Sequence, residues 1–138
     1  MPRPLYESPT DLANELDVAG VLAARWKVSP CKLPISYGVD FGLFRDGAPV
    51  AWAEIKCRTN ARDRYATYCI ALGKAQAGLM LSRATGRPFA IVVRWTDRLG
   101  YLIVKSIEDI RWGGRRDRGD SADLEPMVHW PTESFINL

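Results

Sequence analysis

The sequence contains only one histidine and three cysteines among its 138 residues. His129 is the single histidine, and the cysteines (Cys31, Cys57 and Cys69) do not have the spacing of metal ligands. This shortage excludes zinc sites of the histidine–cysteine type and leaves histidine-based metal hydrolases without ligands. We expect the three cysteines to be buried and reduced, as is usual in a cytosolic protein.

Other features are missing as well. No Gly-x-x-x-x-Gly-Lys-Ser/Thr run is present, which excludes the phosphate-binding loop of an NTPase. No Gly-x-Ser-x-Gly segment supports a serine hydrolase. No apolar run approaches the roughly 18 residues of a membrane-spanning helix, and the start, MPRPLYESPT, lacks the apolar core of a secretion signal. We therefore expect a cytoplasmic protein that has no membrane partner.

What is present is an ordinary globular composition with a small basic excess, at a formal net charge of +3. The length suits one hydrophobic core, so we predict a single domain over residues 1–138. Within it, residues 1–7 are expected to form a loose arm. Residues 106–138 are expected to form a C-terminal extension that carries a basic loop.

A β-hairpin is predicted over Tyr37–Arg58, because the Asp-Gly pair at 46–47 separates two apolar runs. Side chains alternate between the two faces of a strand. Glu54 and Lys56 therefore share one face of the second strand of this hairpin.

The loop length decides whether the hairpin brings two acidic side chains together. With a three-residue loop from Asp46 to Ala48, Asp40 lies directly opposite Glu54, where two carboxylates repel each other unless a cation lies between them. Lys56 and a divalent metal are the candidates for that cation, and Mg²⁺ commonly binds through one or two carboxylates. A two-residue loop would instead place the two acids on opposite faces of the hairpin.

Asp40, followed after thirteen residues by Glu54-Ile55-Lys56 on a hairpin, resembles the core of the PD-(D/E)XK nucleases. The surroundings resemble small phage-encoded members and, more distantly, Holliday-junction resolvases. Val39 stands where the family signature has proline, a departure that is common in the family. The resemblance implies an α/β fold with a restriction-endonuclease-like core, a mixed central β-sheet flanked by helices. It places the protein in the cytoplasm of a bacterial host if a phage encodes it.

The resemblance also implies a set of site residues. Asp40 and Glu54, with the backbone carbonyl of Ile55, would hold Mg²⁺ or Mn²⁺. Lys56 would stabilise the reacting phosphate or deprotonate the attacking water. Family members often add an acid from the first helix, as a metal ligand or through water, and a lysine or glutamine from the helix after the motif. The best matches to these additions are Glu15, Lys74 and Gln76, with Asp11 and Asp17 competing for the first position.

Two arginine clusters indicate a polyanionic partner, because phosphate contacts supply most non-specific affinity for nucleic acids. One cluster follows the hairpin, and the other lies in a Gly-rich segment near the C-terminus. Solvated loops are the alternative interpretation of either cluster alone. The candidate DNA-binding residues are Arg58, Arg62, Arg64, Arg115, Arg116 and Arg118.

Caps and apolar periodicity predict the elements around the hairpin. A helix begins after a Ser8 cap and runs to about Lys27, and Glu15 adjoins its apolar stripe. A short strand is predicted at 32–36. The residues of the predicted stripe are Leu12, Leu16, Ala19, Ala23 and Trp26.

A second helix is predicted over 73–85, ending at Gly86. Strands are predicted at 88–95 and 99–104, where apolar residues of high β propensity are concentrated. An edge strand is predicted at 124–130. The residues of the second helix that are predicted to face inward are Ala77, Met80, Leu81 and Ala84.

These features lead to two functional hypotheses. The first is a Mg²⁺- or Mn²⁺-dependent DNA endonuclease of the PD-(D/E)XK type, with branched DNA as the preferred substrate on resemblance alone. It is expected to act as a homodimer, because one small domain offers one site and a duplex has two strands. The alternative is a non-catalytic DNA-binding or phage-assembly module that keeps the fold and its basic face.

Overall fold

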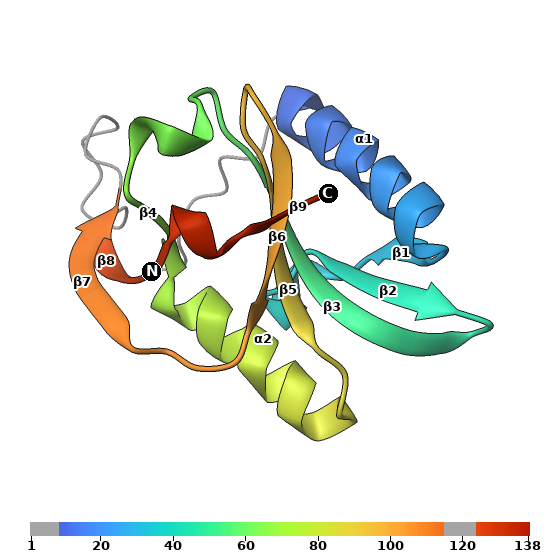
Figure 1. Cartoon of the computed structure of the whole chain (residues 1–138). Coiled ribbons are helices and arrows are strands. Elements are labelled where there is room, and N and C mark those ends of the chain that lie inside the picture. The colour runs from blue at the N-terminus through green and yellow to red at the C-terminus, as the bar shows by residue number, and fades with distance from the viewer. Residues whose placement is uncertain (1–8, 115–123) are drawn as a thin grey trace.

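The computed structural model describes residues 9–114 and 124–138, which are coloured in Figure 1. The predicted N-terminal arm, the Ser8 cap and three candidate DNA-binding residues (Arg115, Arg116 and Arg118) lie outside the described residues. The helices are α1 (Pro9–Trp26) and α2 (Leu72–Thr85), with 3₁₀ turns at Ile35–Tyr37, Arg62–Arg64 and Thr132–Ser134. The strands are β1 (Ser29–Lys32), β2 (Phe41–Arg45), β3 (Ala48–Cys57), β4 (Thr67–Ala71), β5 (Phe89–Arg94), β6 (Leu99–Val104), β7 (Asp109–Gly114), β8 (Leu124–Pro131) and β9 (Ile136–Asn137).

A large mixed sheet forms the centre of the fold. Within the described residues it has six strands, in the order β1-β2-β3-β5-β6-β9. β3 and β5 pair in parallel, and the other neighbours are antiparallel. A parallel pair needs a crossover connection, and here the connection includes α2. α1 and α2 cover opposite faces of the sheet (Figure 1), so the predicted mixed sheet flanked by helices is confirmed. Neither helix has the length and apolar content that a membrane crossing requires.

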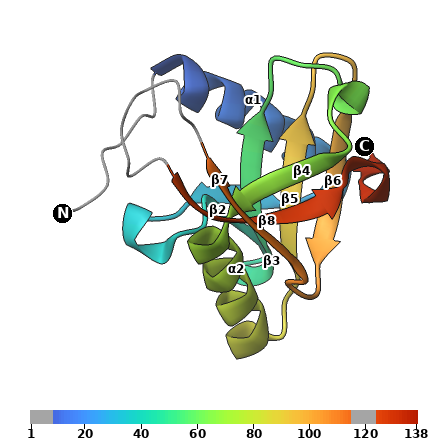
Figure 2. The same cartoon turned by 90° about the vertical axis from the view of Figure 1, so that its left-hand side faces the viewer.

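A second sheet, in the order β4-β8-β7, has no counterpart in the sequence prediction. Figure 2 shows this sheet lying across the face of the large sheet that α2 also covers. The strand predicted at 124–130 exists, but its predicted edge position is wrong, because β8 pairs on one side with β4 and on the other with β7. Thr67 of β4 pairs with Pro131 of β8, which is far from it in sequence. Local sequence patterns carry no information about such pairings.

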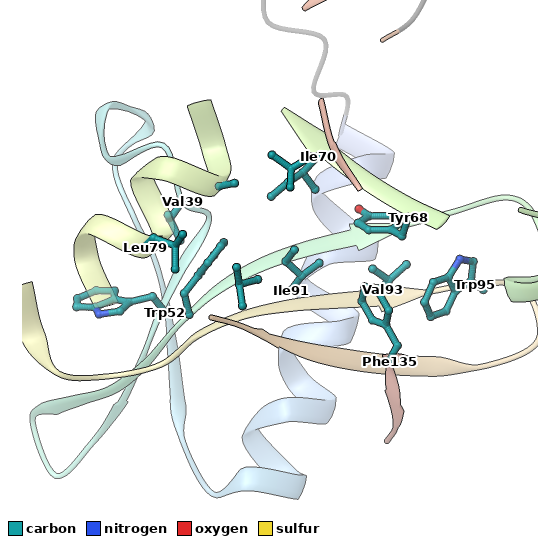
Figure 3. Packing of buried hydrophobic residues seen from close by; sticks show 13 residues of the cluster. Val39, Trp52, Tyr68, Ile70, Leu79, Ile91, Val93, Trp95 and Phe135 are labelled. Atoms are coloured by element: carbon teal, nitrogen blue, oxygen red, sulfur yellow. The ribbon is translucent and has the colours of Figure 1, made fainter. Parts of the chain in front are cut away.

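Two apolar clusters, one on each face of the large sheet, form the core. Ile55 packs beneath α1. The adjacent residue Glu54 points to the opposite face, because side chains alternate along β3. On that face the rings of Tyr68, Trp95 and Phe135 meet edge to face at centroid distances of 5.3 to 6.2 Å (Figure 3). The site end of β3 is thus supported by apolar packing on both sides.

The buried stripe of α1 is rotated from the predicted one. The helix ends at Trp26, within one residue of the prediction, but Leu12 and Leu16 are 38% and 52% exposed. Val18, Ala19 and Leu22 face the sheet in their place. One consequence is that Glu15 becomes part of the buried face. The buried residues are Glu15, Val18, Ala19 and Leu22, an i, i+3, i+4, i+7 set.

α2 matches the predicted helix but turns a partly different face to the core. It ends at Gly86, whose φ of 68° closes the helix in the left-handed conformation, as predicted. Of the residues predicted to face inward, Ala77 and Leu81 pack against the core, whereas Met80 and Ala84 are exposed. Gly78 lies against the Phe89 ring, where an added Cβ would overlap the ring carbons. The close approach at this glycine sets the rotation of the helix. Its buried residues are Ala75, Gly78 and Leu79.

The hairpin loop is shorter than predicted. Arg45 pairs with Ala48, so the loop consists of Asp46 and Gly47 alone. These two residues have φ values of 52° and 77°. Positive φ at both central positions is the type I′ geometry that matches the twist of a hairpin and that Asp-Gly favours. The predicted three-residue loop is therefore wrong.

A β-bulge at Val50 restores the register that the shorter loop would have lost. The pairing of β2 with β3 shifts by one residue there, and Phe41 pairs with Ala53. Asp40, one position further, therefore lies opposite Glu54, as the sequence predicted from a different loop. The expected consequence of a two-residue loop does not occur, because the extra residue of a bulge compensates for the missing loop residue.

The first strand and the cysteines also differ from the prediction. β1 covers Ser29–Lys32 rather than 32–36, and a 3₁₀ turn follows Pro34, whose ring removes a backbone donor from the ladder. All three cysteines are free, as expected, but Cys31 is exposed and the other two are only partly buried. Their predicted burial is wrong, and for Cys31 the reason is its position on an edge strand.

Candidate active site

Asp40 lies immediately before β2, where both its backbone and its side chain are held. Its carbonyl accepts a hydrogen bond from the Leu33 N–H at 2.8 Å. Its carboxylate Oδ2 accepts another from the Ile55 N–H at 3.1 Å. These bonds tie Asp40 to both neighbouring strands, so the orientation of its carboxylate is fixed by the sheet.

Glu54 in β3 is fully buried, which is rare for a glutamate. Its Oε1 accepts a hydrogen bond from Lys74 Nζ at 2.6 Å, and Lys56 Nζ lies 3.5 Å from the same oxygen. Its Oε2 is buried without a hydrogen-bond partner in the described part of the chain. A buried polar atom without a partner costs free energy, so this oxygen suits a ligand that binds it directly.

Glu15 is held on the other side of Asp40. It lies on the buried face of α1, and its Oε2 accepts a hydrogen bond from Lys32 Nζ at 2.9 Å. The same ammonium lies 3.9 Å from Asp40 Oδ1. Sequence reasoning missed Lys32, because the first strand was predicted too far along the chain. In the observed pairing of β1 with β2, Lys32 lies opposite Phe41, the residue next to Asp40. A correct placement of the first strand would therefore have identified Lys32 as a site residue.

The three carboxylates and three lysines alternate in one connected row, which we call the acid–lysine row. Successive nitrogen–oxygen distances along it are 2.9, 3.9, 4.0, 2.6 and 3.5 Å. Both helices and the strands between them contribute to it. Its members, in order, are Glu15, Lys32, Asp40, Lys74, Glu54 and Lys56.

Burial raises the pKa of both glutamates in the row. For Glu54 the loss of hydration is the largest cause and the charge of Asp40 adds to it, while Lys74 and Lys56 counteract both. For Glu15 burial is again the largest cause, and the hydrogen bond from Lys32 opposes it. The site therefore resists a further negative charge and favours a cation.

For Lys56, neighbouring charges rather than burial decide the direction of the pKa shift. Burial alone would lower its pKa, but the charges of Glu54, Asp40 and Glu15 outweigh burial and raise the pKa above the ordinary value. Lys56 therefore stays an ammonium in this arrangement, which suits electrostatic stabilisation better than proton abstraction.

Two of the three side chains predicted to bind a divalent metal, Asp40 and Glu54, are arranged in a way that suits such an ion. Across 9–114 and 124–138, no three His, Cys, Asp or Glu side chains form a group able to hold a metal ion. Asp40 and Glu54 do face each other, and the Ile55 carbonyl points to the same strand edge as the N–H that binds Asp40. Two carboxylates, a carbonyl and several waters are a suitable donor set for Mg²⁺. Glu15, the third predicted ligand, is paired with Lys32.

Gln76 does not reach this site, although it was predicted alongside Lys74. It is exposed and lines a separate hollow together with Met80, Arg83 and Ser106. Two residues turn an α-helix by about 200°, so Lys74 and Gln76 necessarily point in nearly opposite directions. Of the pair, the structure brings only Lys74 to the carboxylates.

The arginines after the hairpin have distinct surroundings. The guanidinium of Arg58 lies over the Tyr68 ring, 4.9 Å from its centroid. Arg62 donates to the Thr132 carbonyl at 3.4 Å, and its side chain is only 18% exposed, so it holds the loop in place. Arg64 is exposed and lies 5.6 Å from the centroid of its neighbouring tyrosine ring.

Comparison with solved structures agrees with this fold. The chain is similar to Hjc, a Holliday junction resolvase from Archaeoglobus fulgidus, with a TM-score of 0.55 and 11% sequence identity, over 86% of this chain and 92% of that one. At this identity the likeness shows the fold alone, and it confirms the restriction-endonuclease-like core. No curated protein matches the chain.

Comparison with known protein families gives a match along the whole sequence. The profile of the family described as "Phage putative PDDEXK endonuclease" covers residues 1–138. In the structure, Lys74 lies within ion-pair distance of both Asp40 and Glu54, and Lys56 lies beside Glu54. The protein therefore belongs to the PDDEXK endonuclease family of phages, which is a family of nucleases.

Proposed function

We propose that this protein is a Mg²⁺- or Mn²⁺-dependent DNA endonuclease whose catalytic residues are Asp40, Glu54 and Lys56. The observation that carries the proposal is the Oε2 of Glu54, which is buried and has no hydrogen-bond partner among the residues that the structure describes. The carboxylate of Glu54 faces Asp40, and Lys56 and Lys74 both approach its other oxygen. A divalent ion held by these acids would satisfy Oε2.

Each residue has a defined task in this proposal. Asp40 and Glu54, with the Ile55 carbonyl, hold the ion, and the hydrogen bond from the Ile55 N–H keeps Asp40 in its binding orientation. The bound ion would supply an activated water and Lewis-acid stabilisation of the phosphate. Lys56, as an ammonium, stabilises the charge that develops on the reacting phosphate. Glu15 acts through water or through Lys32 rather than as a direct ligand.

The DNA is bound beside this site. Arg58 and Arg64 present guanidinium groups close to tyrosine rings, an arrangement that suits phosphate contact and stacking. Arg62 supports the loop that carries Arg64, and Arg115, Arg116 and Arg118 add charge from outside the described residues. We propose branched DNA as the preferred substrate, which the fold similarity to a resolvase supports. A homodimer acting in the host cytoplasm would present one site to each strand.

A cleavage assay on several DNA shapes tests this function. Purified protein is incubated with a four-way junction, a flap, a plain duplex and a single strand, each with Mg²⁺, with Mn²⁺ or with EDTA. We expect cleavage in either metal, no cleavage in EDTA, and the fastest cleavage on the junction. Sedimentation of the same protein with and without the junction reports the dimer.

Matched variants separate catalysis from folding. Glu54→Gln removes the charge at the site while keeping the size of the side chain, and Glu108→Gln makes the same change at an exposed residue. Only the first should abolish cleavage. Tight DNA binding by the parent protein without metal-dependent cleavage of any substrate would instead select the non-catalytic DNA-binding or phage-assembly module.

A further inference from the structure

The acid–lysine row balances its own charge. Three carboxylates alternate with three ammonium groups, so the row has no formal net charge. Two of its lysines each lie between two carboxylates. Lys32 bridges Glu15 and Asp40 at 2.9 and 3.9 Å, and Lys74 bridges Glu54 and Asp40 at 2.6 and 4.0 Å.

The position of Lys74 is the one that a metal ion between Asp40 and Glu54 would need, and Lys32 approaches the same oxygen, Asp40 Oδ1. Lys74 Nζ contacts Glu54 Oε1 and lies within ion-pair distance of Asp40 Oδ1. A divalent ion on these two acids would lie a few ångströms from the ammonium, and like charges at such distances repel strongly where the site is partly dehydrated. The lysine and the ion therefore compete for the same oxygen atoms.

Both bridging lysines can leave the row. Their side chains are 38% exposed, whereas that of Glu54 is fully buried. Lysine carries its charge on a flexible four-carbon stem, so an ammonium can swing toward solvent while the carboxylate stays in place. The phosphates of bound DNA offer such an ammonium a new anionic partner.

We propose that Lys32 and Lys74 hold the place of the divalent ion in the free protein and move to DNA phosphates in the complex, so that DNA and metal bind cooperatively. The inference rests on the proposed nuclease function and adds a regulation of the same site. Free protein binds the ion weakly, and DNA raises its affinity. Linkage requires that the ion raise DNA affinity by the same factor.

The first test measures metal affinity without DNA. Ca²⁺ binding is titrated calorimetrically for the parent, Lys74→Met and Lys32→Met, with Arg94→Met as the control for loss of a positive charge on β5, the strand beside β3. The Arg94 guanidinium donates a hydrogen bond to Asn14 Oδ1 at 3.3 Å and does not bridge two carboxylates of the row. We expect Ca²⁺ to bind at least about tenfold more tightly to each lysine variant, within the usual range of coupling between sites, and to bind Arg94→Met as it binds the parent.

The second test measures the coupling itself. The same titrations are repeated with a short duplex present, and a gel confirms that the duplex remains intact in Ca²⁺. We expect DNA to tighten Ca²⁺ binding to the parent by about tenfold and to the Lys74→Met variant by less than about twofold. Lys74→Gln, which keeps a donor beside Glu54, replaces Lys74→Met if circular dichroism shows that the latter is unfolded.

The outcomes separate this inference from the proposed function. Equal Ca²⁺ affinity in the parent and both lysine variants, with a parent that cleaves DNA in Mg²⁺, overturns the placeholder role and leaves the nuclease intact. An equal gain in Arg94→Met also overturns it, because the general loss of a positive charge would then explain the effect. A parent that neither binds Ca²⁺ in the presence of DNA nor cleaves DNA in Mg²⁺ overturns both.

Discussion

α1 and α2 cover opposite faces of the large sheet, and each sends one charged side chain to the acid–lysine row. α1 supplies an acid, Glu15, which is paired with Lys32. α2 supplies a cation, the ammonium of Lys74, which is paired with the fully buried Glu54. α1 packs on β1 and β3, whereas α2 contacts both the large sheet and the small sheet.

The acids on the two sides of the site, Glu54 near α2 and Glu15 near α1, have different surroundings. On the α2 side, Glu54 is fully buried and has one oxygen without a partner in the described residues, and two lysines approach its other oxygen. On the α1 side, Glu15 is engaged by Lys32. We infer that the α2 side carries the chemistry and that the α1 side adjusts it. Mutations on the two sides should therefore differ in the size of their effects.

The largest effect is expected from the two facing acids. Asp40→Asn and Glu54→Gln each remove a charge that the proposed metal site requires, and cleavage should fall by about 10³-fold or more, as when a preorganised electrostatic partner of the reaction is lost. Single-turnover cleavage of the preferred substrate measures this loss. Parent-like cleavage by either variant would remove the α2 side from the chemistry.

The next effect is expected from Lys56. Lys56→Met keeps the stem but removes the ammonium, and cleavage should fall by about 10²- to 10³-fold. Lys56→Arg keeps the charge and should recover part of the rate if the role is electrostatic. A pH–rate profile separates the roles, because a lysine base would give a rate that rises with pH and that the arginine cannot reproduce.

A smaller effect is expected on the α1 side. Glu15→Gln removes an acid that acts through Lys32 or water, so cleavage should fall by about 10- to 100-fold, as for partners outside the direct ligands of a metal site. Asp17→Gln, an exposed change on the same helix, is the control. A loss as large as that of Glu54→Gln would contradict the division between the two sides.

The helices should also differ in their tolerance of one added methyl group. Gly78→Ala in α2 forces a Cβ into the Phe89 ring and should cost about 1–3 kcal/mol of unfolding free energy. The Cβ of Gly20→Ala in α1 meets no atom of the described residues within 4 Å, and the change should stabilise the protein by about 0.5–1 kcal/mol. Urea unfolding measures both. Equal responses would show that α2 is not the more tightly packed helix.

The smallest effect is a pH dependence of stability. Because the pKa of Glu54 is raised above its ordinary value of 4.5, the folded protein keeps a proton that the unfolded chain releases as the pH rises above that value. The free energy of unfolding should therefore fall with rising pH from about 4.5 up to the folded pKa. The parent-minus-Glu54→Gln difference in metal-free urea unfolding isolates this contribution, and a difference that is constant with pH would refute it.

Local patterns predicted one part of the site and missed another. The alternation of side chains along β3 was enough to put Glu54 and Lys56 on one face, and the Asp-Gly pair was enough to locate the hairpin. The predicted loop was wrong by one residue, and the bulge at Val50 corrected the register. Short-range sequence patterns predict neither the bulge nor the position of Lys32.

Local sequence patterns establish the hairpin, the spans of both helices and the shared face of Glu54 and Lys56, because these depend on neighbours a few residues apart. Tertiary packing was needed to bring Asp40 opposite Glu54 through a bulge, to bury Glu15, to bring Lys74 rather than Gln76 to the acids, and to pair the last strands in a second sheet. Those outcomes depend on how each helix is rotated against the sheet and on which distant strands pair. Both are set by packing among segments that are far apart in the chain.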